Sequence, residues 1–353
     1  MCAAFSSGGV LATGTLKQGE LESKISDSGG LNVTTHESTG YARGCELAFS
    51  DDGKWLATVV SSDELVVIIS DGKTGAVHKR FSSPWREIGK HPIEWAYRSS
   101  FLGGFLADDS LVLWRYVPRE VSDPTDASNL DLYMERWSVE GERLAQLDLG
   151  KLGSGIGGRQ PIFARQAGRL WLPGDCRGNC YRGIQLSGAE ITQSGNLMFP
   201  DDLADPPIPL ADGNGFLAVL GIQKTSQKAA SFDSAGRLQK EVRLPHSPNL
   251  FGPLIPDWFY ASQPQSSSDG EIAAVARTRV AWVLVDTDRD WGSEIVVLKT
   301  QPLTVVTVLK TGKGGIGPIA VDHRNGVVRV VGFWNGRWHD KEYDDQHPGK
   351  WKH

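Results

Sequence analysis

Residues 45–81 contain four short apolar runs separated by turn sequences, and this unit constrains the fold more than any other part of the chain. Asp-Gly and Thr-Gly dipeptides between the runs supply the positive φ angles that hairpin turns require. The unit therefore predicts one antiparallel sheet of four strands. The expected strands are residues 45–50, 55–60, 65–70 and 76–81.

Similar units recur along the whole chain. The stretch AFSSGGVLATGT near the N-terminus aligns with AFSDDGKWLATVV in the clearest unit. Dividing 353 residues among seven units gives about 50 residues each, which is within the range of known repeat architectures. We expect a single domain whose units span about 1–40, 41–83, 84–150, 151–195, 196–245, 246–312 and 313–353.

A lone four-stranded sheet would leave both of its faces exposed to water. Stacking such sheets radially buries both faces of each sheet, except in the outermost strands. A sandwich of this length would be oversized, and no stretch shows a convincing apolar stripe at helical spacing. The pattern therefore predicts an all-β fold, a β-propeller of seven blades with four antiparallel strands each.

The stretch AFSDDGKWLATVVSSDELVVIISDGKTGAV resembles a repeat of the WD-repeat and YVTN-type β-propeller superfamily, in a divergent bacterial-type form. The shared pattern is an apolar strand, Ser-x-Asp-Gly-Lys, a second strand and a Thr-Gly turn. Ile69-Ser70-Asp71 stands where the Trp-Asp dipeptide is expected. The resemblance implies a fold and no activity. The last unit fades near residue 345, so either an outer strand is missing or the tail 351–353 serves as one.

The charge and hydropathy patterns exclude some function classes. A formal net charge of −5 without a basic block argues against nucleic-acid binding. No apolar run reaches the roughly 18 residues of a membrane span. The N-terminus has no basic segment ahead of its apolar residues, so no secretory signal is evident and a cytoplasmic location is favoured, unless the true start lies upstream.

Long loops are expected on one rim of the propeller, around the mouth of the central channel, and this rim is the candidate recognition surface. Ordinary surface loops are the alternative. The long loops are 82–95, 150–160, 196–209 and 246–258, with further loops between second and third strands at 61–64, 174–181 and 287–293. The candidate binding residues there are Trp85, His91, Trp95, Arg177, Tyr181, His246, Asp257, Trp258, Asp290 and Trp291.

His323 is a further histidine expected at or near this rim. Acids, histidines and aromatic residues together could act as a general acid–base set or stack against a sugar. The alternative is that the tryptophans only fill gaps between blades. Trp55, Trp114, Trp171 and Trp282 lie inside expected strands and are interpreted as core. We assign no catalytic residue, no metal ligand and no cofactor.

The four cysteines do not form a disulfide framework for a chain of this size. Cys2 and Cys45 precede apolar runs and are interpreted as small core residues. Cys176 and Cys180 lie in the loop sequence GDCRGNCYRG. They are either plain thiols or a local disulfide, and zinc would require ligands from elsewhere, such as His246 or His323.

Three functions are compatible with this sequence. The first is a non-catalytic platform that binds a protein or peptide through the long-loop rim. The alternative is a propeller enzyme, such as a hydrolase, lyase or lactonase-like protein, or a carbohydrate-binding propeller. Convergence of several His, Asp, Glu or Asn side chains on one point at the channel mouth would favour the enzyme or a metal site.

Overall fold

The computed structural model consists of strands and turns, with no helix among the residues it describes. In the described part of the chain, no helix long and apolar enough to cross a membrane is found. The structure describes residues 1–353 except 18–19, 28–31, 39–43, 62–63, 85–99, 107, 119–129, 152–161, 165–167, 174–178, 188–189, 205, 211–212, 214, 222–225, 246–256, 263, 284–286, 313, 349 and 353.

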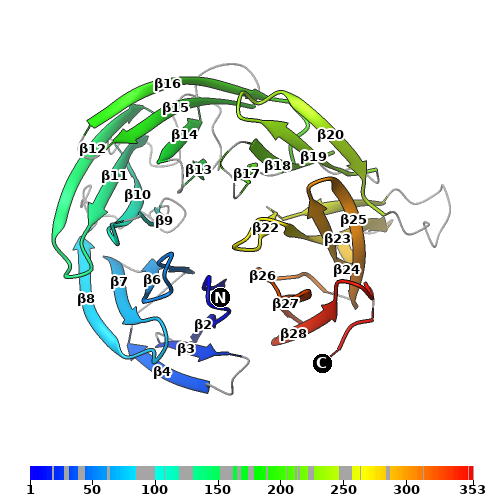
Figure 1. Ribbon diagram of the computed structural model, residues 1–353, viewed down its shortest axis with the longest axis horizontal. Coiled ribbons are helices and arrows are strands. Elements are labelled where there is room, and N and C mark those ends of the chain that lie inside the picture. Colours follow the sequence, from blue (N-terminus) through cyan, green and yellow to red (C-terminus); the bar gives the residue numbers. More distant parts are fainter. Residues whose placement is uncertain are drawn as a thin grey trace. The chain divides into compact units, whose positions relative to one another are not determined.

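The strands form seven sheets, numbered here in chain order (Figure 1). The first sheet contains β1 (Cys2–Phe5), β2 (Leu11–Lys17), β3 (Glu20–Ser26) and β4 (Asn32–Ser38). The second contains β5 (Gly44–Phe49), β6 (Trp55–Ser61), β7 (Glu64–Asp71) and β8 (Val77–Pro84). The third contains β9 (Ser100–Phe105), β10 (Leu111–Pro118), β11 (Leu130–Trp137) and β12 (Arg143–Lys151). The fourth contains β13 (Ile162–Ala164), β14 (Arg169–Pro173), β15 (Asn179–Ser187) and β16 (Glu190–Phe199).

The remaining three sheets follow the same order of neighbouring strands. The fifth contains β17 (Ile208–Pro209), β18 (Gly215–Leu220), β19 (Lys228–Asp233) and β20 (Leu238–Arg243). The sixth has five strands, β21 (Asp257–Ala261), β22 (Gln265–Ser266), β23 (Ile272–Val283), β24 (Thr287–Thr300) and β25 (Leu303–Gly312), with both β21 and β22 paired to β23. The seventh has three, β26 (Ile319–Arg324), β27 (Val327–Trp334) and β28 (Arg337–Asp344).

The chain divides into two compact units, each described by itself below. The first comprises Met1–Cys176 and Arg182–Ser194, and the second comprises Arg177–Tyr181 and Gly195–His353. The first three sheets belong to the first unit, and the last three belong to the second.

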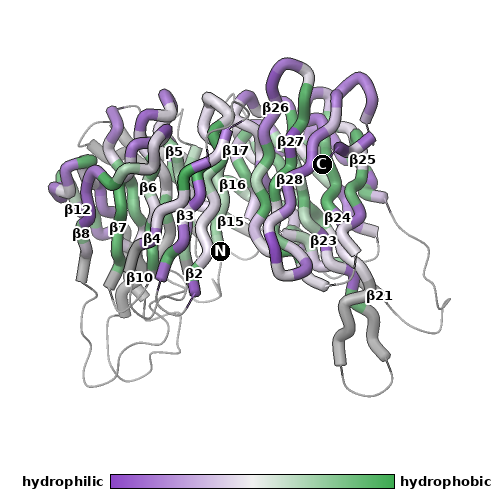
Figure 2. Tube along the Cα trace, turned by 90° about the horizontal axis from the view of Figure 1, so that it is seen from below, coloured by the Kyte–Doolittle hydropathy of each residue, from purple (hydrophilic) through white to green (hydrophobic). Residues whose placement is uncertain are grey.

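The second sheet buries both of its faces, as expected for stacked sheets. Successive residues of a strand point to opposite faces. Val67 packs on one face against Leu113 of the third sheet. Val66, its neighbour in the chain, packs on the other face against Leu21 of the first sheet. This two-sided burial explains the unbroken apolar run from Leu65 to Ile69 in β7, and the hydrophobic colour follows β6 and β7 in Figure 2.

The sixth sheet shows the same arrangement in the second unit. Val275 and Val296 pack against Leu217 of the fifth sheet. Val297, one residue further along β24, faces the other way and packs against Val330 of the seventh sheet. The buried side chains of each unit are therefore layers between adjacent sheets.

The turn between β5 and β6 shows how the recurring Ser-x-Asp-Gly sequence ends one strand and begins the next. Asp52 Oδ1 accepts hydrogen bonds from Ser50 Oγ at 2.7 Å and from the backbone N–H of Lys54 at 2.9 Å. Gly53 has φ of 70° and donates its N–H to the Ser50 carbonyl. The predicted positive-φ turn is confirmed.

Gly53→Val should destabilise the first unit by about 1–3 kcal/mol, because a β-branched residue is strained at positive φ. Its Cβ would also lie 3.4 Å from the Ser6 side chain. Thermal or urea unfolding measures the effect. The matched control is Gly8→Val, because Gly8 is not at positive φ and its Cβ would make only an ordinary contact. Equal losses at the two positions would contradict the turn geometry.

The C-terminal tail lies against the outer strand of the seventh sheet. Lys352 pairs with Glu342 of β28 in an antiparallel bridge, and its N–H donates to the Glu342 carbonyl at 2.7 Å. The preceding residue, Trp351, packs edge-on against the buried Tyr343 ring at 4.7 Å. Of the two alternatives for this sheet, the structure therefore supports the tail as a short outer strand.

Several expected loops are partly strand, among them 287–293 and 196–209. Residues 287–293 begin β24, which pairs with β23 through this stretch, and residues 196–199 belong to β16. The charged sequence Asp288-Arg289-Asp290 suggested a loop. Cross-strand pairing satisfies backbone groups whatever the side-chain charge, so an extended hairpin accommodates it.

Candidate functional site

Half of the residues expected on the long-loop rim lie outside the described part of the chain. They are Trp85, His91, Trp95, Arg177 and His246. Their role in binding stays a prediction.

Tyr181 is the clearest correction among the rim candidates. Its side chain is fully buried, and its ring packs edge-on against Phe199 at 5.8 Å. A ring enclosed in this way offers no surface to a ligand. The polar sequence around Tyr181 suggested a loop, but the residue lies inside β15, where an aromatic side chain fills the core.

In the sixth sheet, strand pairing places two other rim candidates on either side of the same residue of the strand between them. Val280 of β23 pairs with Trp258 of β21 on one side and with Asp290 of β24 on the other. Asp257 and Trp291 are their chain neighbours. The strand pairing thus gathers four predicted residues at one end of a single sheet.

The cysteine interpretation needs a correction. Cys2 and Cys45 form a disulfide with a Cα–Cα distance of 5.6 Å. Both are buried, as expected of core residues, but they are bonded because β1 and β5, the first strands of adjacent sheets, lie side by side. Disulfides are typical of oxidising compartments, so this bond weighs against the cytoplasmic expectation. Cys180 is disulfide-bonded, and its predicted partner Cys176 lies outside the described residues.

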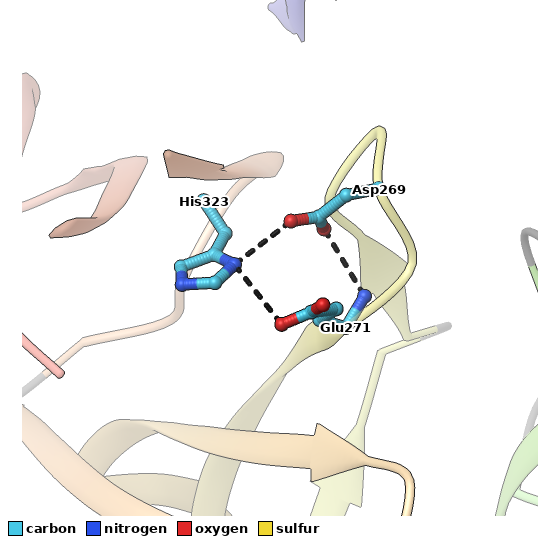
Figure 3. Close-up of side chains that lie close together, drawn as sticks. All are labelled: Asp269, Glu271 and His323. Atoms are coloured by element: carbon cyan, nitrogen blue, oxygen red, sulfur yellow. Dashed lines mark hydrogen bonds and ion pairs between the residues drawn. The ribbon is translucent and has the colours of Figure 1, made fainter. Parts of the chain in front are cut away.

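One cluster of potential metal-ligating side chains in the described residues consists of Asp269, Glu271 and His323 (Figure 3). Asp269 and Glu271 lie on the turn that leads into β23, and His323 lies near the end of β26. In the seventh sheet this is the end that carries the short β26–β27 turn, so His323 is not at the expected long-loop end.

The turn fixes one oxygen of Asp269 and leaves the other for His323. Asp269 Oδ1 accepts hydrogen bonds from Ser267 Oγ at 2.5 Å and from the Glu271 N–H at 3.0 Å. Asp269 Oδ2 lies 2.8 Å from His323 Nδ1, and Glu271 Oε2 lies 3.7 Å from the same nitrogen. The other ring nitrogen of His323, Nε2, is 3.5 Å from Asp345 Oδ2. Three carboxylates therefore surround one imidazole.

Electrostatics at this cluster are dominated by negative charge. Burial raises the pKa of Asp269, but hydrogen bonds from Ser267, Glu271 and His323 outweigh it and hold this pKa below its usual value. Burial raises the pKa of the nearby Asp322, and the negative charge of Asp269 contributes to that rise. Arg324 is paired with Asp322 at 3.1 Å.

A second perturbed acid lies in the first unit. Glu46 of β5 accepts a hydrogen bond from the backbone N–H of Leu102 on β9. Burial raises the pKa of its carboxyl to about 7, although this hydrogen bond opposes the rise. Sequence reasoning missed Glu46, because a single acid in a short strand carries no recognisable pattern.

Glu46→Gln should stabilise the protein at pH 8 and leave its stability unchanged at pH 4. The folded chain favours the protonated acid, so this contribution is complete below the unfolded pKa of 4.5 and is lost as the pH rises through about 7. Glutamine imitates the protonated form, with a gain of up to about 3 kcal/mol. Urea unfolding at several pH values measures it, and a pH-independent difference would contradict the assignment.

Comparison with known proteins identifies the fold. No protein-family model matches the chain, and the search of curated proteins found no match to its sequence. Among solved structures, the β-propeller domain of Cps50 (Swd1) from Myceliophteria thermophila is similar over 96% of this chain and 94% of its own, with a TM-score of 0.55 and 12% identity. The C-terminal WD40 domain of Sif2 is similar over 98% of this chain and 81% of its own, with a TM-score of 0.51 and 13% identity. This chain has the fold of a WD40-type β-propeller.

The seven sheets are accordingly the seven blades of the propeller, and the predicted all-β fold is confirmed. At these identities the likeness describes the fold, so no functional residue is carried over from either structure. The chemistry of this propeller has to be argued from its own side chains.

A buried ion pair lies within the sixth blade of the propeller. Arg277 of β23 is directly opposite Glu294 of β24, and the two side chains are hydrogen-bonded. The Arg277 guanidinium also donates to the Pro245 carbonyl at 2.5 Å and lies 4.3 Å from the centre of the Phe259 ring. Burial lowers the pKa of Arg277, and the charge of Glu294 opposes this shift. Two guanidinium nitrogens, Nε and Nη1, are buried without a hydrogen-bond partner.

Proposed function

We propose that this propeller is a non-catalytic platform that binds a protein or peptide partner through the long connections at one end of its blades. The propeller scaffold is the basis of this proposal, because it holds loops on rigid sheets. The third blade carries the supporting observation. Residues 85–99 and 152–161 flank it, and residues 119–129 join β10 to β11.

In the third blade, the strand ends that these segments join lie at the same end of the sheet. In a sheet of four antiparallel strands, the first strand begins, the second strand connects to the third, and the last strand ends at the same end of the sheet. The opposite end carries only the turns between Phe105 and Leu111 and between Trp137 and Arg143. The sequence segments that join these strand ends are therefore longer than the turns at the opposite end, and one of them contains Trp95, a residue type that is enriched in binding hot spots.

A site-specific photo-crosslinker can test this assignment. It would replace His91 in one variant and Glu142, on the short-turn end of the same blade, in the matched control. We expect the crosslinker at residue 91, and not at residue 142, to capture a discrete protein in cells that express the chain. That protein, once purified, should bind the wild-type propeller.

A second variant separates binding from folding. Replacing residues 85–99 by a Gly-Ser linker of equal length should weaken binding of the captured protein by at least about ten-fold, because the contacts are lost. The melting temperature should stay the same. Equal capture at both positions, or binding that survives the replacement, would refute the proposal.

A further inference from the structure

We propose that Asp269, Glu271 and His323 bind a divalent transition-metal ion, with Asp345 as the acid that orients the histidine. This site is separate from the proposed protein-binding end, and it does not depend on that proposal. The argument rests on the ligand atoms, the second nitrogen of His323 and the comparison with an equivalent turn.

The three ligand atoms are already gathered. His323 Nδ1, Asp269 Oδ2 and Glu271 Oε2 lie within 4.8 Å of one another. Around a tetrahedral ion with bonds of about 2.0–2.1 Å, ligand atoms are about 3.3 Å apart. On binding, the distance from His323 Nδ1 to Asp269 Oδ2 would lengthen from 2.8 Å, and the distance from the same nitrogen to Glu271 Oε2 would shorten from 3.7 Å. Each change is about half an ångström. The Glu271 side chain is 63% exposed and can make this adjustment.

The second nitrogen of His323 has the surroundings of a metal-bound histidine. Histidine ligands generally donate their other ring N–H to a carboxylate or carbonyl group, which fixes the ring orientation. His323 Nε2 is buried, makes no hydrogen bond, and lies 3.5 Å from Asp345 Oδ2. With the ion on Nδ1, the single ring proton resides on Nε2 and points toward Asp345. The Nδ1 proton, when present, is released to solvent.

The equivalent turn of the second blade shows that hydrogen bonding within the turn does not explain the cluster. Asp52 receives the same two hydrogen bonds there, from Ser50 Oγ and from the Lys54 N–H. Lys54 stands in the position that Glu271 occupies in the sixth blade. The turn therefore needs only its aspartate, and the acid at position 271 adds negative charge beside His323.

The ligand types indicate the class of ion. An imidazole nitrogen together with carboxylate oxygens suits Zn²⁺ and other first-row ions better than Ca²⁺ or Mg²⁺, which prefer oxygen alone. Three protein ligands leave a position for water. The negative charge of Asp269, Glu271 and Asp345 would be offset by the ion.

Zinc titration of the untagged full chain by isothermal calorimetry tests the proposal, with ion stoichiometry from native mass spectrometry. We expect one Zn²⁺ per chain in the wild type. Glu271→Gln should weaken binding by well over ten-fold, because it removes a ligand from an exposed side chain without altering the turn. Asp345→Asn should weaken binding by about ten-fold, since it changes only the acid that orients the histidine. The matched control is Asp52→Asn, which should bind zinc like the wild type.

One further measurement keeps the test decisive. Co²⁺ should give visible absorption bands in the wild type that are lost in Glu271→Gln and His323→Ala. If His323→Ala fails to fold, the difference in zinc affinity between Glu271→Gln and Asp52→Asn still tests the proposal. Absence of zinc binding by the wild type at millimolar concentration would overturn the proposal. So would equal affinities for zinc in the wild type and Glu271→Gln.

Discussion

Loss of the Cys2–Cys45 disulfide should lower the free energy of unfolding by about 4 kcal/mol. The bond joins residues separated by 43 positions, and closing a loop of that size removes about this much chain entropy from the unfolded state. It also joins the first strands of two adjacent blades, each of which depends on its neighbour for burial. We therefore expect the loss to appear as cooperative destabilisation of the first unit.

The variant Cys2→Ala/Cys45→Ala, unfolded in urea without reductant, measures this effect. A variant is preferable to reduction alone, because Cys180 is also disulfide-bonded and a reductant would act on both bonds. Added reductant should destabilise the wild type more than it destabilises the variant. Equal stability of wild type and variant under oxidising conditions would contradict the prediction.

Arg277→Met should destabilise the propeller by about 3–5 kcal/mol. Removing one partner of a buried ion pair leaves the other charge uncompensated, and Glu294 is only 6% exposed. Methionine retains much of the arginine volume, so the measured loss reports charge rather than a cavity. Urea unfolding at pH 7 gives the value.

The double variant Arg277→Met/Glu294→Met completes the thermodynamic cycle. With both charges gone, we expect stability to recover to within about 1–2 kcal/mol of the wild type, because well-packed apolar pairs often replace buried ion pairs at little cost. A double variant as unstable as Arg277→Met would show that the loss comes from packing or from the hydrogen bond to Pro245. Arg169→Met, at an exposed hydrogen bond to Gln185, is the surface control.

Most of the propeller scaffold could be predicted from the sequence, because each of its strands and turns is marked by a pattern of neighbouring residues. The Asp-Gly and Thr-Gly turns around β6 and β7 set the hairpins, and strands such as β7 are apolar on both faces because both are covered. The core positions of Trp114 and Trp171 were predicted correctly. Trp55 is only half-buried, and the Trp282 side chain lies outside the described part.

The site residues were harder to predict, because they depend on contacts between distant parts of the chain. Cys2 meets Cys45, and Asp269 meets His323, only once neighbouring blades are stacked. One local signal was available for the cluster. Glu271 replaces the lysine found at the same turn position in the clearest repeat, and aligning turns rather than strands would have revealed it.

The incomplete outer edge of the seventh blade affects self-association. In the described part of the chain, the tail pairs with β28 at Glu342 alone, so the rest of this strand has no described neighbour on its outer side. Uncovered strand edges can recruit a second molecule, and charged side chains oppose this. β28 exposes Arg337, Asp340 and Glu342. These charges would keep concentrated solutions of the propeller from pairing edge to edge.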